Sequence, residues 1–358
     1  MAQASNPRDI ATIDMVHPEC HCRMNATNGQ YAAKVYNLCY RYNATLIGRR
    51  MNCTLLTYLS ALGLLDQQDA STDDHATFNV TLNPPIVMAA SSNHFGELMK
   101  GVGSAQRLFP NVRIIVYDLG LAAPRQTDDV KRLCNVEYRK FNAKQWPPGT
   151  ENLFHYRWKP LVIAMAYNEF RDGFWYADTS LRYHGNYSSD ELYRWIQQRQ
   201  MDVSLPLYMD VSNYVTTDQK LYQYLPTDVA RLQSIGSYGG GHQFWVRTSR
   251  SRTLLTWYVL CALEAECMAP TPVMNLICHF NKHDRHRAHA NCHRFDQSAI
   301  NIILANEHRF NESRYAMMGT NENFTLFADT RQKVDSYHPK RCRNQIDNVI
   351  PKKAGAVP

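Results

Sequence analysis

The chain has 358 residues, of which 44% are hydrophobic, 20% charged and 11% aromatic, and its formal net charge is +7. This length can hold one large domain with an appendage or two ordinary domains, and the composition excludes long disorder, collagen-like repeats and solenoids. The positive charge is spread out except for a basic stretch at 282–294, and the chain has no base-reading module, so we expect no nucleic-acid partner.

Ten cysteines and seven Asn-x-Ser/Thr sequons together indicate an oxidising compartment. The sequons begin at Asn25, Asn43, Asn52, Asn79, Asn186, Asn311 and Asn323. The alternative is a cytosolic metal-binding protein with reduced cysteines and chance sequons. No stretch approaches the roughly 20 apolar residues that cross a bilayer, and the first residues lack a signal-peptide pattern. We therefore expect membrane attachment only through an anchor absent from this chain.

Residues 1–82 differ from the rest of the chain, because they contain four of the cysteines, four of the sequons and a polar run at 66–77 without apolar periodicity. The range 36–65 has enough apolar residues for one or two short helices, tied down by Cys39 and Cys53. The pattern predicts a disulfide-containing N-terminal stem.

A strand, a helix and a second strand follow the stem. The apolar run 86–90 predicts a buried strand, 95–108 a helix, and 112–117 a strand that ends at Asp118. Such crossovers are right-handed and parallel, and open parallel sheets bind ligands beyond the carboxyl ends of their strands. Ser91, Ser92, His94 and Asp118 follow these two strands and are candidate ligand-binding residues.

The alternation of strands and helices continues along the chain. Strands are predicted at 136–141, 174–177 and 242–246, and helices at 160–170, 252–264 and 297–306. This order favours an α/β fold with a doubly wound, mixed sheet.

Lys159 at a helix start and Asp178 at the end of the following strand suggest sugar-nucleotide chemistry. A diphosphate needs cationic neutralisation, a helix start favours anions, and a donor sugar needs an acceptor for its hydroxyl groups. The alternative is a solvated lysine and an ordinary turn aspartate.

At this point the chain resembles glycosyltransferases of the GT-A fold, within them the glycogenin and bacterial galactosyltransferase group. It resembles more closely an animal family expanded in nematodes, through the motifs at 90–94, 117–121, 158–160 and 178–180. The resemblance covers roughly 84–306. It implies a Rossmann-like, GT-A-type domain that uses a UDP-sugar.

The resemblance also implies roles for several residues. The sequence 294–301 looks like the Asp-Gln-x-x-x-Asn helix start of the group, so Asp296 and Gln297 would face the reacting carbon as catalytic residues; alternatively, Asp296 only caps the helix. The glycine cluster would let a ligand approach the backbone, with Gly240, Gly241 and His242 on the donor or acceptor. A satisfied, half-buried histidine is the alternative for His242.

The metal site of the family is incomplete in this sequence. Of its Asp-x-Asp motif only Asp178 is present, because Ser180 stands at the second position. Asp178 is therefore a tentative ligand for Mn²⁺ or another divalent ion, and Ser180 a donor-binding residue; alternatively, a basic residue such as Lys159 replaces the metal.

Cysteines and histidines are dense between residues 278 and 293. Their spacing fits no common zinc site, so we expect disulfides between Cys278 and Cys292 and between Cys261 and Cys267.

Together these patterns predict a stem at 1–82, a catalytic domain at 83–345 and a tail at 346–358. The expected function is transfer of a sugar from a nucleotide-diphosphate donor to a glycan or glycoprotein acceptor, in the Golgi lumen or after secretion. The alternative is a non-catalytic glycan- or nucleotide-binding protein on a degenerate transferase fold.

Overall fold

The computed structural model describes residues 8–10, 17–24, 34–65, 83–184, 189–317, 327–329 and 337–342. The sequons at Asn25, Asn79, Asn186 and Asn323, the polar run at 66–77 and the tail at 346–358 lie outside these residues. The other three sequon asparagines, Asn43, Asn52 and Asn311, are exposed.

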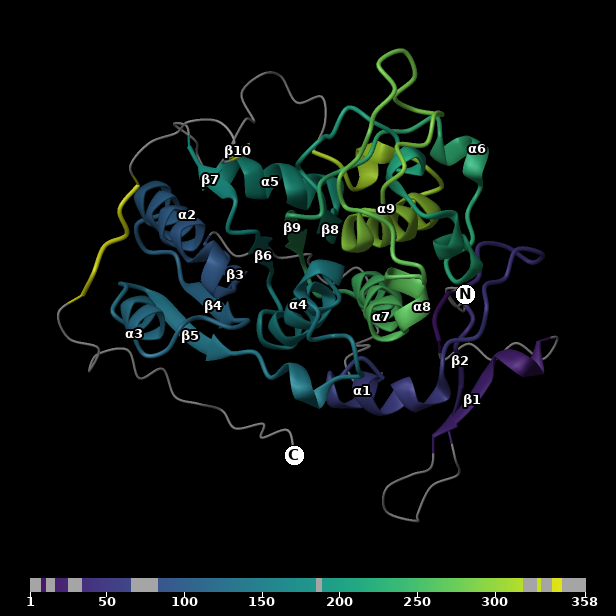
Figure 1. Ribbon diagram of the computed structural model, residues 1–358, viewed down its shortest axis with the longest axis horizontal. Coiled ribbons are helices and arrows are strands. Elements are labelled where there is room, and N and C mark those ends of the chain that lie inside the picture. The colour runs from purple at the N-terminus through teal and green to yellow at the C-terminus, as the bar shows by residue number, and fades with distance from the viewer. Residues whose placement is uncertain are drawn as a thin grey trace.

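The centre of the fold is a six-stranded mixed sheet with the strand order β5-β4-β3-β6-β9-β8 (Figure 1). The strands β3 to β6 pair in parallel, whereas β9 runs antiparallel to both of its neighbours. The six strands are β3 (Ile86–Ala90), β4 (Ile114–Asp118), β5 (Val136–Lys140), β6 (Phe174–Ala177), β8 (Val203–Ser204) and β9 (His242–Trp245). The expected α/β fold with a doubly wound, mixed sheet is confirmed.

Side chains alternate between two apolar cores, one on each face of the sheet. On β6, Phe174 and Tyr176 join one core, while Trp175 and Ala177 join the other. Because successive residues of a strand point to opposite faces, nearly continuous apolar runs are needed where both faces are covered. This is why the central strands read as unbroken hydrophobic segments.

The helices lie on both faces of the sheet. The helices that follow the N-terminal segment are α2 (Phe95–Leu108), α3 (Arg125–Lys131), α4 (Trp158–Glu169), α5 (Ser189–Arg199), α6 (Val229–Leu232), α7 (Ser249–Leu263), α8 (Ala265–Met268) and α9 (Phe295–Glu307). In Figure 1, α4, α7 and α9 group together, whereas α2 and α3 lie at the other end of the molecule. The predicted helices and strands all form, with ends displaced by three residues at most. A short pair of strands, β7 (Leu181–Tyr183) and β10 (Phe327–Asp329), lies outside the main sheet.

The N-terminal segment packs against the helical side of the domain. It contains the hairpin β1 (His21–Met24) and β2 (Lys34–Asn37) and one helix, α1 (Leu56–Ala61). Leu38 and Leu59 are fully buried in the same core as α4, α7 and α9. The described part of this segment is therefore integrated with the domain, and the boundary at residue 82 stays a prediction.

Five disulfides use all ten cysteines. The expected pairs Cys278–Cys292 and Cys261–Cys267 are present, and the others are Cys20–Cys39, Cys22–Cys53 and Cys134–Cys342. Cys20–Cys39 and Cys22–Cys53 tie down the N-terminal hairpin, and Cys134–Cys342 joins segments 208 residues apart. This framework is consistent with a secreted or luminal protein. Within the described residues, no helix has the length and apolar character to cross a membrane.

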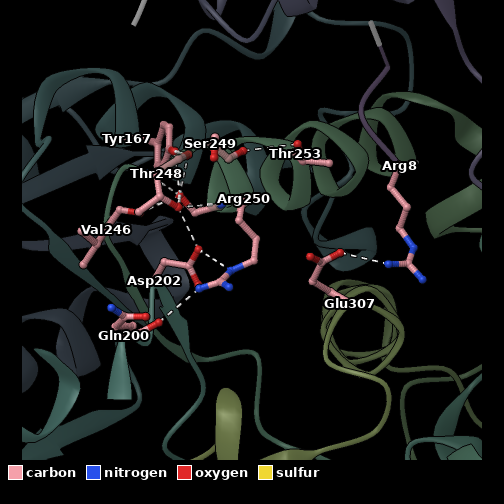
Figure 2. A network of polar contacts seen from close by, with 11 residues as sticks. Arg8, Tyr167, Gln200, Asp202, Val246, Thr248, Ser249, Arg250, Thr253 and Glu307 are labelled. Atoms are coloured by element: carbon pink, nitrogen blue, oxygen red, sulfur yellow. Dashed lines mark hydrogen bonds and ion pairs between the residues drawn. The ribbon is translucent and has the colours of Figure 1, made fainter. Parts of the chain in front are cut away.

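A polar network joins the edge of the sheet to the start of α7 (Figure 2). Asp202, which is buried beside β8, accepts hydrogen bonds from Arg250 at 2.9 Å and Thr248 at 2.8 Å. Thr248 and Ser251 form a reciprocal capping box, which satisfies backbone N–H groups at the start of α7. The network thereby fixes α7, the helix against which α4 packs.

Candidate functional site

Lys159, Asp178 and Asp296 come together at the carboxyl edge of the parallel strands, and we call them the charged cluster. Lys159 lies in the first turn of α4, Asp178 directly follows β6, and Asp296 lies in the first turn of α9. A helix that follows a parallel strand begins at the carboxyl edge of the sheet, where ligands of open α/β sheets bind. The topology therefore places the cluster where a ligand is expected.

A buried arginine fixes the start of α4. Arg157 donates hydrogen bonds to the carbonyl groups of Ala262 at 2.6 Å and Leu263 at 2.9 Å, in the last turn of α7. These carbonyls would otherwise lack partners at the helix end. The contact holds the first turn of α4, and with it Lys159, in place.

Two ion pairs hold the charged cluster together. The Nζ atom of Lys159 lies 2.7 Å from Oδ2 of Asp296 and 3.2 Å from Oδ2 of Asp178. The side chains of Lys159 and Asp296 are 2% and 7% exposed, whereas that of Asp178 is 29% exposed. Asp178 is therefore the member of the cluster that a ligand reaches first.

The cluster contains one ammonium group and two carboxylates, so its charges do not cancel. Burial by itself would lower the pKa of Lys159, but Asp178 and Asp296 outweigh it and the pKa is raised. Burial raises the pKa of Asp296 despite the nearby lysine. Lys159 consequently remains a cation at neutral pH.

Polar groups around the cluster fix the orientation of Asp178. Its Oδ1 accepts a hydrogen bond from the hydroxyl of Tyr176 at 2.7 Å, and its backbone N–H donates to the carbonyl of Gly241. Gln243 donates to the carbonyl of Gly240 at 2.8 Å and accepts from Trp245 Nε1 at 3.0 Å. These hydrogen bonds hold the loop that contains Gly240 and Gly241 against the carboxylates of Asp178 and Asp296.

Gly240 and Gly241 are needed for this close approach. A Cβ atom on Gly241 would lie 2.7 Å from Oδ2 of Asp178, and one on Gly240 would lie 2.9 Å from Oδ2 of Asp296. A side chain at either position would push the carboxylates out of place. The structure thus brings both predicted glycines to the cluster.

Gln297, the other predicted catalytic residue, lies beside the cluster and is half-buried. Its amide donates to the hydroxyl of Ser237 at 3.2 Å, and its Cα would lie 3.1 Å from a Cβ on Gly240. Asn301 holds the neighbouring backbone, since its amide bonds both the N–H and the carbonyl of Tyr238. Asp296 and Gln297 thus face the loop of Gly240.

Ser91, Ser92 and His94 follow β3, next to β6 in the sheet. His94 pairs with Glu97 at 2.9 Å, and Glu97 in turn lies 3.5 Å from the hydroxyl of Thr179. This chain of contacts connects the end of β3 with the residue after Asp178. Ser91 is half-buried and Ser92 and His94 are exposed, so these polar groups line the edge near the cluster.

Two predicted site residues lie elsewhere. Asp118 is buried and accepts hydrogen bonds from the backbone of Gly120 and Leu121 and from the Tyr138 hydroxyl, so it stabilises the turn after β4. His242 is fully buried on the opposite face of the sheet from the cluster, stacked on Trp175 with centroids 4.4 Å apart. His242 is thus more deeply buried than the half-buried histidine of the alternative.

The frame of β9 explains the position of His242. Side chains alternate along a strand, so the residue that shares the face of the cluster is Gln243. The alternative role of Asp296 as a helix cap is wrong: Arg294 occupies the N-cap position, and Asp296 lies inside the first turn. Tyr176 was missed as a partner of Asp178, although its spacing of two residues in a strand places it on the same face.

The charged cluster does not fit a divalent metal ion. Both oxygens of Asp178 already accept hydrogen bonds, from Tyr176 and Lys159, and Ser180, two positions further on, has no carboxylate. In the described part of the chain, no group of three or more His, Cys, Asp or Glu residues is arranged to hold a metal. Divalent ions prefer several oxygen ligands, each at a distance of roughly 2.0–2.6 Å from the ion.

Comparison with known proteins gives a partial family match. Residues 20–164, less than half of the chain, match the family model described as "Protein of unknown function (DUF1647)". This range includes Lys159 but neither Asp178 nor Asp296. No curated protein matches the chain.

Solved structures that resemble the chain include three sugar-transferring enzymes. Galactosyltransferase LgtC, with donor and acceptor sugar analogues, has a TM-score of 0.36 and 12% identity over 61% of this chain and 70% of its own. Mouse xyloside xylosyltransferase 1 has a TM-score of 0.37 and 11% identity over 65% and 84%. Core-mannan synthase A from Aspergillus fumigatus, in a Mn/GDP form, has a TM-score of 0.36 and 9% identity over 51% and 67%.

Proposed function

We propose that this protein is a GT-A-type glycosyltransferase that transfers a sugar from a nucleotide-diphosphate donor to a glycan or glycoprotein acceptor. The observation that carries the proposal is the charged cluster at the carboxyl edge of the sheet, where Lys159 joins two carboxylates from different elements. Asp178, the most accessible member, would accept hydrogen bonds from donor hydroxyls. Because a sugar presents several hydroxyl donors, a fixed carboxylate is a suitable partner.

The surroundings of the cluster support binding of the nucleotide part as well. β3 and β6 lie side by side in the sheet, but the chain forms β4 and β5 on one side of β3 before it returns to form β6 on the other. Nucleotides bind open α/β sheets at such a switch point. Ser91, Ser92 and His94 at the end of β3, with Thr179 and Ser180 after β6, would contact the nucleoside, which we propose to be uridine.

The catalytic step would use Asp296 and Gln297. The bond between the anomeric carbon and the diphosphate oxygen breaks, the nucleotide diphosphate leaves, and an acceptor hydroxyl bonds to the carbon and passes its proton to the departing diphosphate. Positive charge develops on the sugar as the diphosphate departs, and a nearby carboxylate and amide oxygen stabilise that charge. The first turns of α4 and α9 add a favourable potential for the departing anion.

The proposed site of action is the Golgi lumen or the extracellular space. Five disulfides and three exposed sequon asparagines support this assignment. Intact-mass measurement with and without reduction and deglycosylation tests it. Ten free thiols and no N-glycan on the protein isolated from its own cells would contradict the assignment.

Binding of nucleotides tests the proposed function. We expect UDP and at least one UDP-sugar to bind in calorimetric titration and to raise the melting temperature, and Asp178→Asn to weaken UDP-sugar binding at least about tenfold. Asp172→Asn is the matched control, because Asp172 is exposed and lies in the turn before β6. Absence of binding to any of UDP, GDP and a panel of their sugars would refute the proposal.

A second candidate is a non-catalytic binding protein on the same fold. The observation that favours it is the burial of Asp296, whose carboxylate is paired with Lys159 instead of facing solvent. The two candidates differ in turnover. Donor binding without release of nucleotide diphosphate, in the presence of a glycan acceptor panel, would support the second.

A further inference from the structure

Lys159 occupies a site built for a cation. Besides the two carboxylate oxygens, its Nζ lies 3.5 Å from the carbonyl oxygen of Gly240. Three aromatic rings surround it, with centroids 5.3 Å away for Tyr156, 5.4 Å for Tyr176 and 5.9 Å for Trp158. Oxygen atoms and aromatic faces both stabilise positive charge. The lysine is thus held by two carboxylates, one long carbonyl contact and three aromatic rings.

A divalent ion bound to Asp178 would have to share this site with the ammonium group. An ion at an ordinary coordination distance from Oδ2 of Asp178 would lie within about 5 Å of Nζ, given the 3.2 Å contact of Lys159. Two cations at that distance in a buried site repel each other strongly. The family motif would supply a second aspartate next to Asp178, but Ser180 stands at that position, and the other carboxylate of the cluster, Asp296, is already paired with Lys159 at 2.7 Å.

We propose that Lys159 takes the place of the divalent metal in this protein, so that the donor binds without a metal ion and Asp178 acts as a hydroxyl acceptor instead of a metal ligand. The inference rests on the proposed function for the identity of the donor. Lys159 offsets the charge of Asp178, which would otherwise repel the diphosphate. The ammonium has three N–H donors, and the long contact to Gly240 leaves one of them weakly engaged.

Manganese uptake tests this inference without any nucleotide. Free Mn²⁺ is measured by electron paramagnetic resonance during titration into the full-length wild-type protein and into Lys159→Met. We expect no uptake by the wild type and uptake of one ion by Lys159→Met, because the two carboxylates then surround a vacant cation site. Asp178→Asn in the Lys159→Met background should abolish that uptake, whereas Asp172→Asn should not.

Each result decides the inference. Uptake of one Mn²⁺ by the wild type, lost in Asp178→Asn, would overturn it, and so would a folded Lys159→Met protein that takes up none. If Lys159→Met does not fold, the wild-type titration and Lys159→Arg still decide, since both retain a cation and should exclude Mn²⁺.

A nucleotide titration separates this inference from the proposed function. With UDP, we expect the dissociation constants in Mn²⁺ and in EDTA to agree within about twofold. A loss of more than about tenfold in EDTA would show that a metal accompanies the nucleotide and would overturn the inference. Absence of UDP binding in both buffers would count against the proposed function, while the Mn²⁺ comparison would still test the lysine.

Discussion

Replacing Lys159 by methionine should cost about 3–5 kcal/mol of folding free energy at pH 7, which is the range for removing one partner of a buried ion pair. Methionine fills a similar volume, so the loss comes from the charge and not from a cavity. Lys159 and Asp296 are almost fully buried, so solvent cannot take over the role of the lysine. Asp178 is half-buried, so solvent screens part of its contribution to this cost.

The cost should depend on pH in a defined direction. Burial already raises the pKa of Asp296 in the wild type, and loss of Lys159 would raise it further. A carboxyl whose pKa is higher in the folded state destabilises that state as pH rises through the range between its unfolded and folded values. The deficit of Lys159→Met should therefore be largest at neutral pH and shrink as the pH falls towards 4.

Urea unfolding followed by tryptophan fluorescence at pH 7 and pH 5 measures this prediction. Lys144→Met is the matched control, since Lys144 is exposed. Adding Asp296→Asn to Lys159→Met should recover part of the loss, because the uncompensated charge is removed. A deficit below about 1 kcal/mol, or one that Asp296→Asn does not reduce, would refute the reasoning.

Three further changes have defined outcomes. Gly241→Ala should weaken UDP-sugar binding at least about tenfold, because the added methyl group displaces Asp178. Calorimetry measures the affinity, and an unchanged value would mean that the loop before β9 shifts to accommodate the methyl group. Thr248→Ala should cost about 1 kcal/mol in urea unfolding through loss of the α7 cap, with Thr253→Ala, outside the capping box, as the control. Burial lowers the pKa of His242 to about 3. As the pH falls below about 6.5, the unfolded chain takes up a proton on this histidine while the folded protein does not, so the free energy of unfolding should decrease by up to about 1.4 kcal/mol per pH unit. His242→Phe should therefore make the free energy of unfolding less dependent on pH in the acidic range. An unchanged pH dependence would contradict the conclusion that His242 is buried and uncharged.

The sequence predicted the central sheet well because its signals are local. The runs at 86–90 and 174–177 match β3 and β6 residue for residue, since strands covered on both faces need unbroken apolar segments. Helix starts were less accurate: α4 begins at Trp158, two residues before Pro160, because Arg157 holds its first turn through contacts with α7. Such a tertiary contact leaves no local signal.

The candidate site shows the same division. Lys159, Asp178 and Asp296 could be selected from residue type and position, but their meeting depends on how α4, β6 and α9 converge. The sequence analysis placed His242 at the ligand because the glycine cluster precedes it. Successive side chains of a strand point to opposite faces of the sheet, however, and His242 points away from the charged cluster. Gln243 could have been chosen from that alternation alone.

The ion pairs of Lys159 also bear on how the parts of the molecule unfold. Burying an ammonium group is unfavourable until carboxylates reach it, and one of them, Asp296, lies 137 positions further along the chain. If α9 detached, the ammonium group of Lys159 would remain buried next to Tyr156 and Trp158 without the carboxylate of Asp296. The docked position of α4 would then be unstable. The two helices and the end of β6 should therefore open together as one cooperative unit, and a partly unfolded form that keeps α4 docked without α9 should be poorly populated.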